Sequence, residues 1–147
     1  PAFLEIGASK HGYTVGMVRC AVLGRHPEAE SLHALAEEVI DALVAAVKPG
    51  TSAAAVDAAG REVLKRSGRK GVFRQRTGYQ TGINWTERGD LSLEPGANDI
   101  LQSGMTLHMP NILCSENGYL FGAGAHVLVT ESGAELLSQT PPTLYRA

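Results

Sequence analysis

Between positions 32 and 47 the apolar residues recur at the spacing of one helix face, and this run restricts the fold more than any other stretch. The set consists of Leu32, Leu35, Ala36, Val39, Ile40, Leu43 and Val47. Steps of three and four residues are typical of an amphipathic helix. Pro27, Glu28 and Glu30 suit a helix start, because proline fits the first turn and carboxylates favour its positive end. The helix therefore needs a second layer to cover its apolar face.

A second helix is expected directly after the first. The stretch "KPGTS" at 48–52 ends the first helix and offers Thr51 or Ser52 as N-cap of the next. Val56, Val63 and Leu64 give that second helix a modest apolar face, and "RSGRKG" ends it near 66–71.

The remaining segments read as strands. Residues 2–7 and 13–23 predict a hairpin, and "MTLHMPNIL", "GYLFGAG", "HVLVT" and "AELLS" predict antiparallel strands joined by turns at "SENG" and "ESG". The fold class is α+β: a hairpin, two helices, then a sheet meander. With 147 residues and 44% hydrophobic content, positions 1–147 are expected to form one domain.

The composition argues against several partners. A net charge of −2 and a pI near 6.2 do not favour nucleic acid or an anionic membrane. No apolar run approaches the roughly 18 residues of a membrane span, and no basic and apolar leader precedes the first strand. Cys20 and Cys114 are too few for a disulfide framework, so a reducing, cytoplasmic location is expected.

Five stretches occur in an order that resembles a known family. They are "EIGASKHGYTVGMVR" at 5–19, "KPGTS" at 48–52, "GYQTG" at 78–82, "LQSGM" at 101–105 and "VLVTESGAELL" at 127–137. Together they resemble the C-terminal part of the pita-bread fold of the M24 peptidase, creatinase and prolidase superfamily. The resemblance implies an incomplete catalytic domain without the upstream part of the fold. It also implies a homodimer or an association with that upstream part.

The metal site of that superfamily does not carry over. Its five ligand positions, two Asp, one His and two Glu, fall on Glu5, Gly16, Tyr79, Pro110 and Gly124. Two metal ions need several carboxylates as ligands and counter-charge, and two glycines and a proline supply none. We therefore expect no metal and no other cofactor.

Some members of the superfamily, such as creatinase and ectoine hydrolase, hydrolyse small C–N substrates without metal. The local patterns "EIGA", "RTGYQTG" and "GMTLHMP" look nearest to ectoine hydrolase-like sequences. The resemblance implies a metal-independent hydrolase whose substrate is a small cyclic amidine or amide. The alternative is a non-catalytic pita-bread module that serves as a binding protein or scaffold.

Three residues are the candidate catalytic groups. Glu5 is a carboxylate between Leu4 and Ile6 in a short apolar strand, and it is expected to act as nucleophile or general base. His108 is expected to carry a proton to the leaving nitrogen with a pKa near neutrality. The Tyr79 hydroxyl is expected to orient the substrate or a developing oxyanion. A shared pocket for the three would favour the enzyme over the scaffold.

Secondary roles are expected for other side chains. Trp85, Glu87 and His126 are candidate substrate-binding residues. Arg19 is expected to pair with a neighbouring carboxylate. His11, His26 and His33 are expected at turns or on helix surfaces and are given no chemical role.

Overall fold

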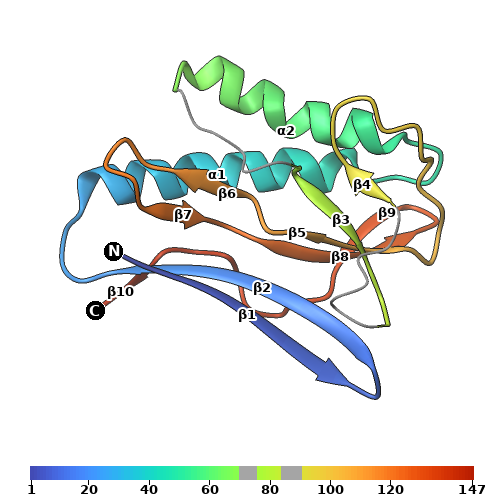
Figure 1. Cartoon of the computed structure of the whole chain (residues 1–147), viewed down its shortest axis with the longest axis horizontal. Helices are drawn as coiled ribbons and strands as arrows, with labels where there is room; N and C mark the ends of the chain where they lie inside the picture. The colour runs from blue at the N-terminus through green and yellow to red at the C-terminus, as the bar shows by residue number, and fades with distance from the viewer. Residues whose placement is uncertain (70–75, 84–90) are drawn as a thin grey trace.

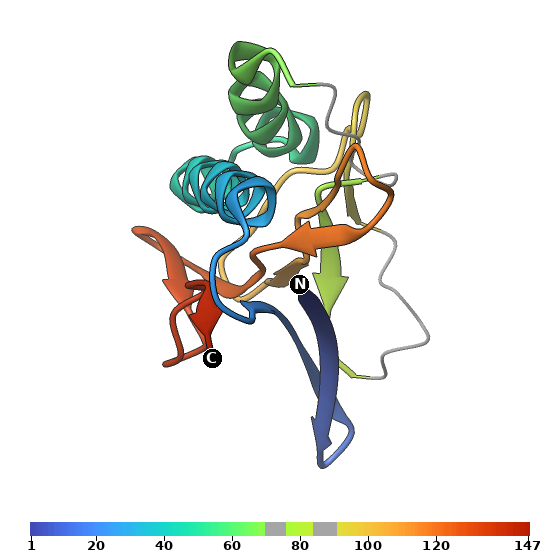
Figure 2. The ribbon, with the colours of Figure 1, turned by 90° about the vertical axis from the view of Figure 1, so that its left-hand side faces the viewer.

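The computed structural model describes residues 1–69, 76–83 and 91–147. Two helices lie on one side of a five-stranded sheet, and a long β-hairpin lies on its other side (Figure 1). The view turned by 90° shows the same three layers, with the hairpin extending away from the sheet at one end (Figure 2). The α+β architecture expected from the sequence is confirmed.

The hairpin is formed by β1 (Ala2–Lys10) and β2 (Tyr13–Val22), with β10 (Tyr145–Arg146) parallel to β2. The turn between them uses His11 and Gly12 at positive φ, 52° and 85°. This left-handed conformation costs glycine little, and histidine enters it more readily than most residues. The register pairs Glu5 with Val18 and Gly7 with Gly16. Both predicted strands are confirmed, and β1 runs three residues further than expected.

Helix α1 spans Pro27–Ala46 and α2 spans Ala53–Ser67. The Ser52 hydroxyl accepts a hydrogen bond from the Ala55 N–H, which confirms one of the two expected caps. A Cβ on Gly60 of α2 would lie 2.8 Å from Leu43 Cδ2 of α1, so a larger residue there would require the Leu43 side chain or one of the helices to shift. The expectation that His33 lies on a helix surface is wrong, because its side chain is 1% exposed and lies edge-on against Phe121.

The main sheet has the order β4-β3-β5-β8-β9, and every pairing in it is antiparallel. Its strands are β4 (Ser92–Leu93), β3 (Gly78–Thr81), β5 (Thr106–Met109), β8 (Ala125–Thr130) and β9 (Gly133–Leu136). A separate pair joins β6 (Ile112–Cys114) and β7 (Leu120–Gly122). The stretch "MTLHMPNIL" thus forms two strands rather than one. Pro110 lacks an N–H for the ladder, and Asn111 has a φ of 41°.

Strand alternation divides the sheet residues between two environments. Leu107, Val127 and Val129 join the apolar side chains of α1 and α2 in one core. The residues between them, including His108 and His126, point to the hairpin side, where Gly16 contacts His126. The sheet therefore places two histidines on the face that the hairpin covers.

No helix in the described part of the chain is long and apolar enough to cross a membrane.

Candidate active site

Three polar aromatic side chains form a row across the sheet. Tyr79 of β3 pairs with His108 of β5, and His108 pairs with His126 of β8. Directly opposed residues in antiparallel strands share a face, so the three side chains point to the same side. All three are buried, with exposures of 8%, 0% and 3%. The sheet register thus brings together residues that the sequence separates by up to 47 positions.

Tyr79 and His108 are hydrogen-bonded to each other. The Tyr79 hydroxyl lies 3.1 Å from His108 Nδ1, and the two rings meet edge-on with centroids 5.4 Å apart. The Arg76 guanidinium lies over the Tyr79 ring, 4.4 Å from its centroid. These contacts fix the phenol in direction, as a group that orients a substrate requires.

His108 is a neutral imidazole at neutral pH. Burial, followed by the nearby His126, lowers the pKa of His108 from 6.5 to about 3. The expectation of a pKa near neutrality is therefore wrong, because a fully buried ring loses the hydration that stabilises its cation. The ring lies nearly parallel to that of His126, with centroids 5.7 Å apart.

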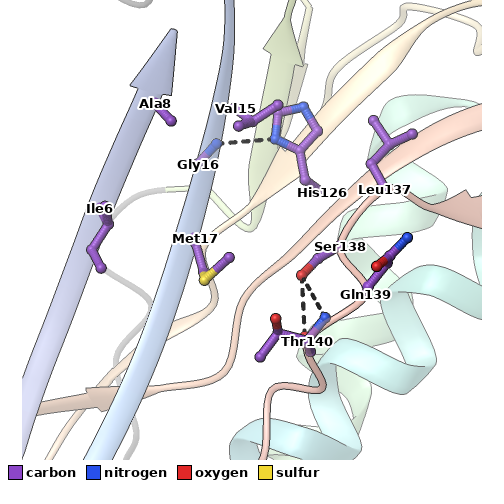
Figure 3. A pocket seen from close by; sticks show the side chains of 10 residues that line it. All are labelled: Ile6, Ala8, Val15, Gly16, Met17, His126, Leu137, Ser138, Gln139 and Thr140. Atoms are coloured by element: carbon purple, nitrogen blue, oxygen red, sulfur yellow. Dashed lines mark hydrogen bonds between the residues drawn. The ribbon is translucent and has the colours of Figure 1, made fainter.

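His126 has both ring nitrogens engaged by the protein. The Gly16 N–H donates to Nδ1 at 3.1 Å (Figure 3). Nε2 lies 2.7 Å from the Thr81 hydroxyl. A backbone N–H can only donate, so Nδ1 carries no proton and the neutral ring holds its proton on Nε2. Burial lowers the pKa of His126 as well. Thr81 is a site residue that the sequence did not indicate. Gly16, which the resemblance placed at a ligand position, takes part through its backbone N–H.

A cavity of about 340 Å³ lies beside His126, between the hairpin and residues 137–140 (Figure 3). Its walls are mostly apolar: Ile6, Ala8, Val15, Met17 and Leu137. A few polar groups in an apolar cavity are typical of small-molecule sites. The cavity therefore suits a small ligand near one end of the Tyr79–His108–His126 row.

Glu5 does not join this row. Its side chain is exposed on β1, and it has no hydrogen bond or ion pair with any residue in the ranges 1–69, 76–83 and 91–147. The strand that reaches the sheet is β2, through Gly16 and Val18. Of the three expected catalytic groups, the structure thus brings two together. Trp85 and Glu87 lie outside the described residues.

The residues at the five ligand positions that the resemblance implies do not fit a metal centre. The Tyr79 hydroxyl is paired with His108, and a Cβ on Gly124 would lie 2.9 Å from Val18 Cβ. Gly124 therefore leaves no room for a ligating side chain. Within the described ranges, no group of three or more His, Cys, Asp and Glu side chains could hold a metal ion. These donors do not fit a two-metal centre.

Arg19 has a different set of partners from the expected carboxylate. Its guanidinium donates to the carbonyl oxygens of Val18, Gly124 and Thr140 and to the Ser138 hydroxyl. All four acceptors are neutral, and Arg19 takes part in no ion pair in the part of the chain that the structure describes. The expectation was wrong because the fold brings backbone carbonyls from two distant segments to this side chain.

Sequence comparison relates the chain to characterised proteins. The model of metallopeptidase family M24 matches residues 1–131. The ectoine hydrolase of Halomonas elongata is 36% identical over 97% of this chain and 36% of its own length. The agropine synthesis cyclase of Rhizobium rhizogenes is 32% identical over 90% of this chain and 34% of its own. The chain thus spans about a third of the length of these relatives.

Solved structures share the fold. A dipeptidase PepE from Mycobacterium ulcerans superposes with a TM-score of 0.86 at 26% identity, covering 98% of this chain and 39% of that one. An X-Pro aminopeptidase from Thermotoga maritima gives a TM-score of 0.87 at 18% identity, covering 99% of this chain and 41% of that one. At the latter identity the likeness concerns the fold alone.

Proposed function

The chain belongs to metallopeptidase family M24. We propose that it is part of a hydrolase that opens a C–N bond in a small cyclic amidine or amide without a metal ion. The observation that carries this proposal is the Tyr79–His108 hydrogen bond. This bond links Tyr79, which stands at a ligand position of the family, to the imidazole of His108. Such a pair can position a phenol hydroxyl against a substrate atom.

The low pKa of His108 changes the role proposed for it. A ring whose pKa is about 3 holds almost no proton at neutral pH, so it cannot store one for the leaving group. In the proposed arrangement His108 Nδ1–H donates to the Tyr79 oxygen and fixes the phenol. In this proposal the Tyr79 O–H is the group that donates to the substrate. His108 is thus a positioning residue, and Tyr79 contacts the substrate.

Glu5 is the proposed base or nucleophile, and it would reach the substrate from β1, outside the Tyr79–His108–His126 row. As base, it takes a proton from the water molecule whose oxygen adds to the amidine or amide carbon. The Tyr79 hydroxyl stabilises the negative charge that develops on the substrate atom it contacts. The ring C–N bond then breaks, and the proton held by Glu5 passes to the leaving nitrogen. As nucleophile, Glu5 would form the new bond to carbon itself, and water would cleave that intermediate.

Two relatives support a substrate other than a peptide. The Halomonas elongata protein is named an ectoine hydrolase and the Rhizobium rhizogenes protein a cyclase, and both align with nearly all of this chain. Ectoine, a cyclic amidine, is therefore the first substrate to test.

The test incubates the purified protein with ectoine and related cyclic amidines and amides, with and without EDTA. We expect ring-opened product by NMR at a rate that the chelator leaves unchanged. Activity that EDTA abolishes and Mn²⁺ restores would refute the metal-free mechanism. A dipeptide serves as the control substrate, and its cleavage in place of the cyclic compounds would refute the substrate class.

A non-catalytic binding module is the second candidate. The observations that favour it are the exposure of Glu5 and the full engagement of both His126 nitrogens within the protein. Under this proposal the cyclic compound binds, which calorimetry detects, and no product forms. A Tyr79→Phe variant separates the two functions, because only the hydrolase needs the hydroxyl during turnover.

A further inference from the structure

Arg19 is a buried cation with unusual partners. Its side chain is 7% exposed, and it donates to three carbonyl oxygens and one hydroxyl. The contacts with Ser138 and Thr140 join β2 to the C-terminal segment. A structural clamp accounts for these four hydrogen bonds. It does not account for the positive charge.

The charge of Arg19 has no counter-ion in residues 1–69, 76–83 and 91–147. Its Nε–H is buried and has no acceptor among these residues. Removing a guanidinium from water without an anion nearby is unfavourable, because neutral dipoles replace only part of its hydration. Arg19 therefore carries a positive charge that no described carboxylate neutralises.

A second cavity lies next to Arg19, distinct from the one beside His126. Its volume is about 270 Å³, and α1 contributes Ile40, Asp41 and Val44 to its wall. Arg19 and the segment that includes Ser138 and Thr140 also line it. That segment separates the two cavities, and its internal hydrogen bonds are drawn in Figure 3.

Asp41 supplies the opposite charge in this cavity. Its side chain is exposed, and it forms no ion pair with any described residue. The wall thus carries one buried cation and one exposed anion that are not paired with each other. A ligand with both charges would bring an anion near the positive charge of Arg19 and a cation near Asp41, whereas a simple anion would meet Asp41 as a like charge.

We propose that this cavity binds a small organic zwitterion, with its carboxylate toward Arg19 and its cationic nitrogen toward Asp41. The volume lies just below the roughly 300–1,000 Å³ of typical ligand sites, which suits a molecule the size of an amino acid. Ile40, Val44 and Leu136 provide apolar contact for its carbon chain. The site is independent of the proposed hydrolysis, and its test does not involve turnover.

The experiment follows the Arg19 Nε–H signal in a proton–nitrogen NMR spectrum of the whole chain. The probes are L-alanine, β-alanine and γ-aminobutyrate, which differ in the separation of their charges. Acetate and ethylamine are the matched single-charge controls. We expect one of the zwitterions to shift the Arg19 signal in a saturable manner, at concentrations at which neither control does.

Asp41→Asn tests the second contact without disturbing the core, because Asp41 is exposed. We expect the zwitterion to bind roughly fivefold more weakly to this variant, the effect of one partly exposed charge pair. Glu38→Gln is the matched control on the same helix. It is also exposed, does not line the cavity, and should leave binding unchanged.

Arg19→Lys identifies the NMR signal and tests the guanidinium, with a thermal melt to confirm that the variant is folded. If no zwitterion shifts the Arg19 signal up to its solubility limit, the proposal is wrong. It is equally wrong if acetate binds as well as the zwitterions, or if Asp41→Asn binds them unchanged.

Discussion

The backbone N–H of Gly16 donates a hydrogen bond to His126 Nδ1 across 110 residues of sequence. This bond joins the hairpin to β8, because Gly16 lies on the edge of β2 that faces away from β1. It requires an unprotonated Nδ1, so the hairpin and the sheet are held together by a neutral imidazole. His108 beside it is neutral as well.

Acid is therefore expected to destabilise the protein below about pH 6.5. The pKa of His108 is lowered from 6.5 to about 3 on folding, so the unfolded chain takes up its proton first. The stability that a neutral His108 contributes is complete above pH 6.5 and is lost as the pH falls toward 3. At pH 5 the loss from this one residue is about 2 kcal/mol.

Urea unfolding at pH 7 and pH 5 measures this loss. His108→Gln should reduce the pH dependence between those two points by about the same 2 kcal/mol. His11→Asn, at an exposed turn, should retain the wild-type dependence. An unchanged dependence in His108→Gln would show that the ring is hydrated in the folded protein.

Tyr79→Phe should lower kcat by about 100-fold if the hydroxyl stabilises developing charge, which is the effect of losing one such donor. The ring and its contact with Arg76 are retained. The loss of the His108 bond should cost only about 1 kcal/mol of stability. Steady-state kinetics and a thermal melt on the same sample separate the two effects. Full activity in this variant would remove the phenol from the mechanism.

Glu5→Gln should abolish hydrolysis and leave the free energy of unfolding within about 0.5 kcal/mol of wild type. The reason is that Glu5 is exposed and has no described hydrogen bond or ion pair to lose. Glu131→Gln, in the exposed turn after β8, is the control and should alter neither property. Undiminished turnover in Glu5→Gln would exclude Glu5 as both base and nucleophile.

Gly124→Ala should destabilise the protein by about 1–3 kcal/mol, as expected for overpacking. The new Cβ would meet Val18 Cβ at 2.9 Å, so β2 or β8 must shift. Gly7→Ala is the control, because no atom lies within 4 Å of its Cβ position. Thermal melts rank the two. Equal melting temperatures would mean that position 124 has room for a metal-ligating side chain after all.

The secondary structure could be predicted where local patterns dominate. The apolar spacing from Leu32 to Val47 and the Ser52 cap predicted α1 and α2, since both features act within one turn of helix. The same approach missed the break at Pro110 and Asn111. An apolar run does not reveal that one of its residues must leave the ladder.

The candidate site could be predicted only in part. Tyr79 and His108 were both candidate site residues from the sequence, and the structure pairs them. The partners of His126 and Arg19 were not predictable, because Gly16, Thr81 and Thr140 bind through backbone atoms or an ordinary hydroxyl. Backbone groups occur along the whole chain and hydroxyls at many positions, so neither gives a distinguishing sequence signal.

The sequence by itself determined the fold class and the family, since each depends on residue types and their order. Only the tertiary structure decided the protonation of His108, the tautomer of His126 and the isolation of Arg19 from any described carboxylate. The physical reason is that hydration, hydrogen-bond direction and counter-charge depend on which distant atoms surround a group. Residue order does not specify those neighbours until the sheet has formed.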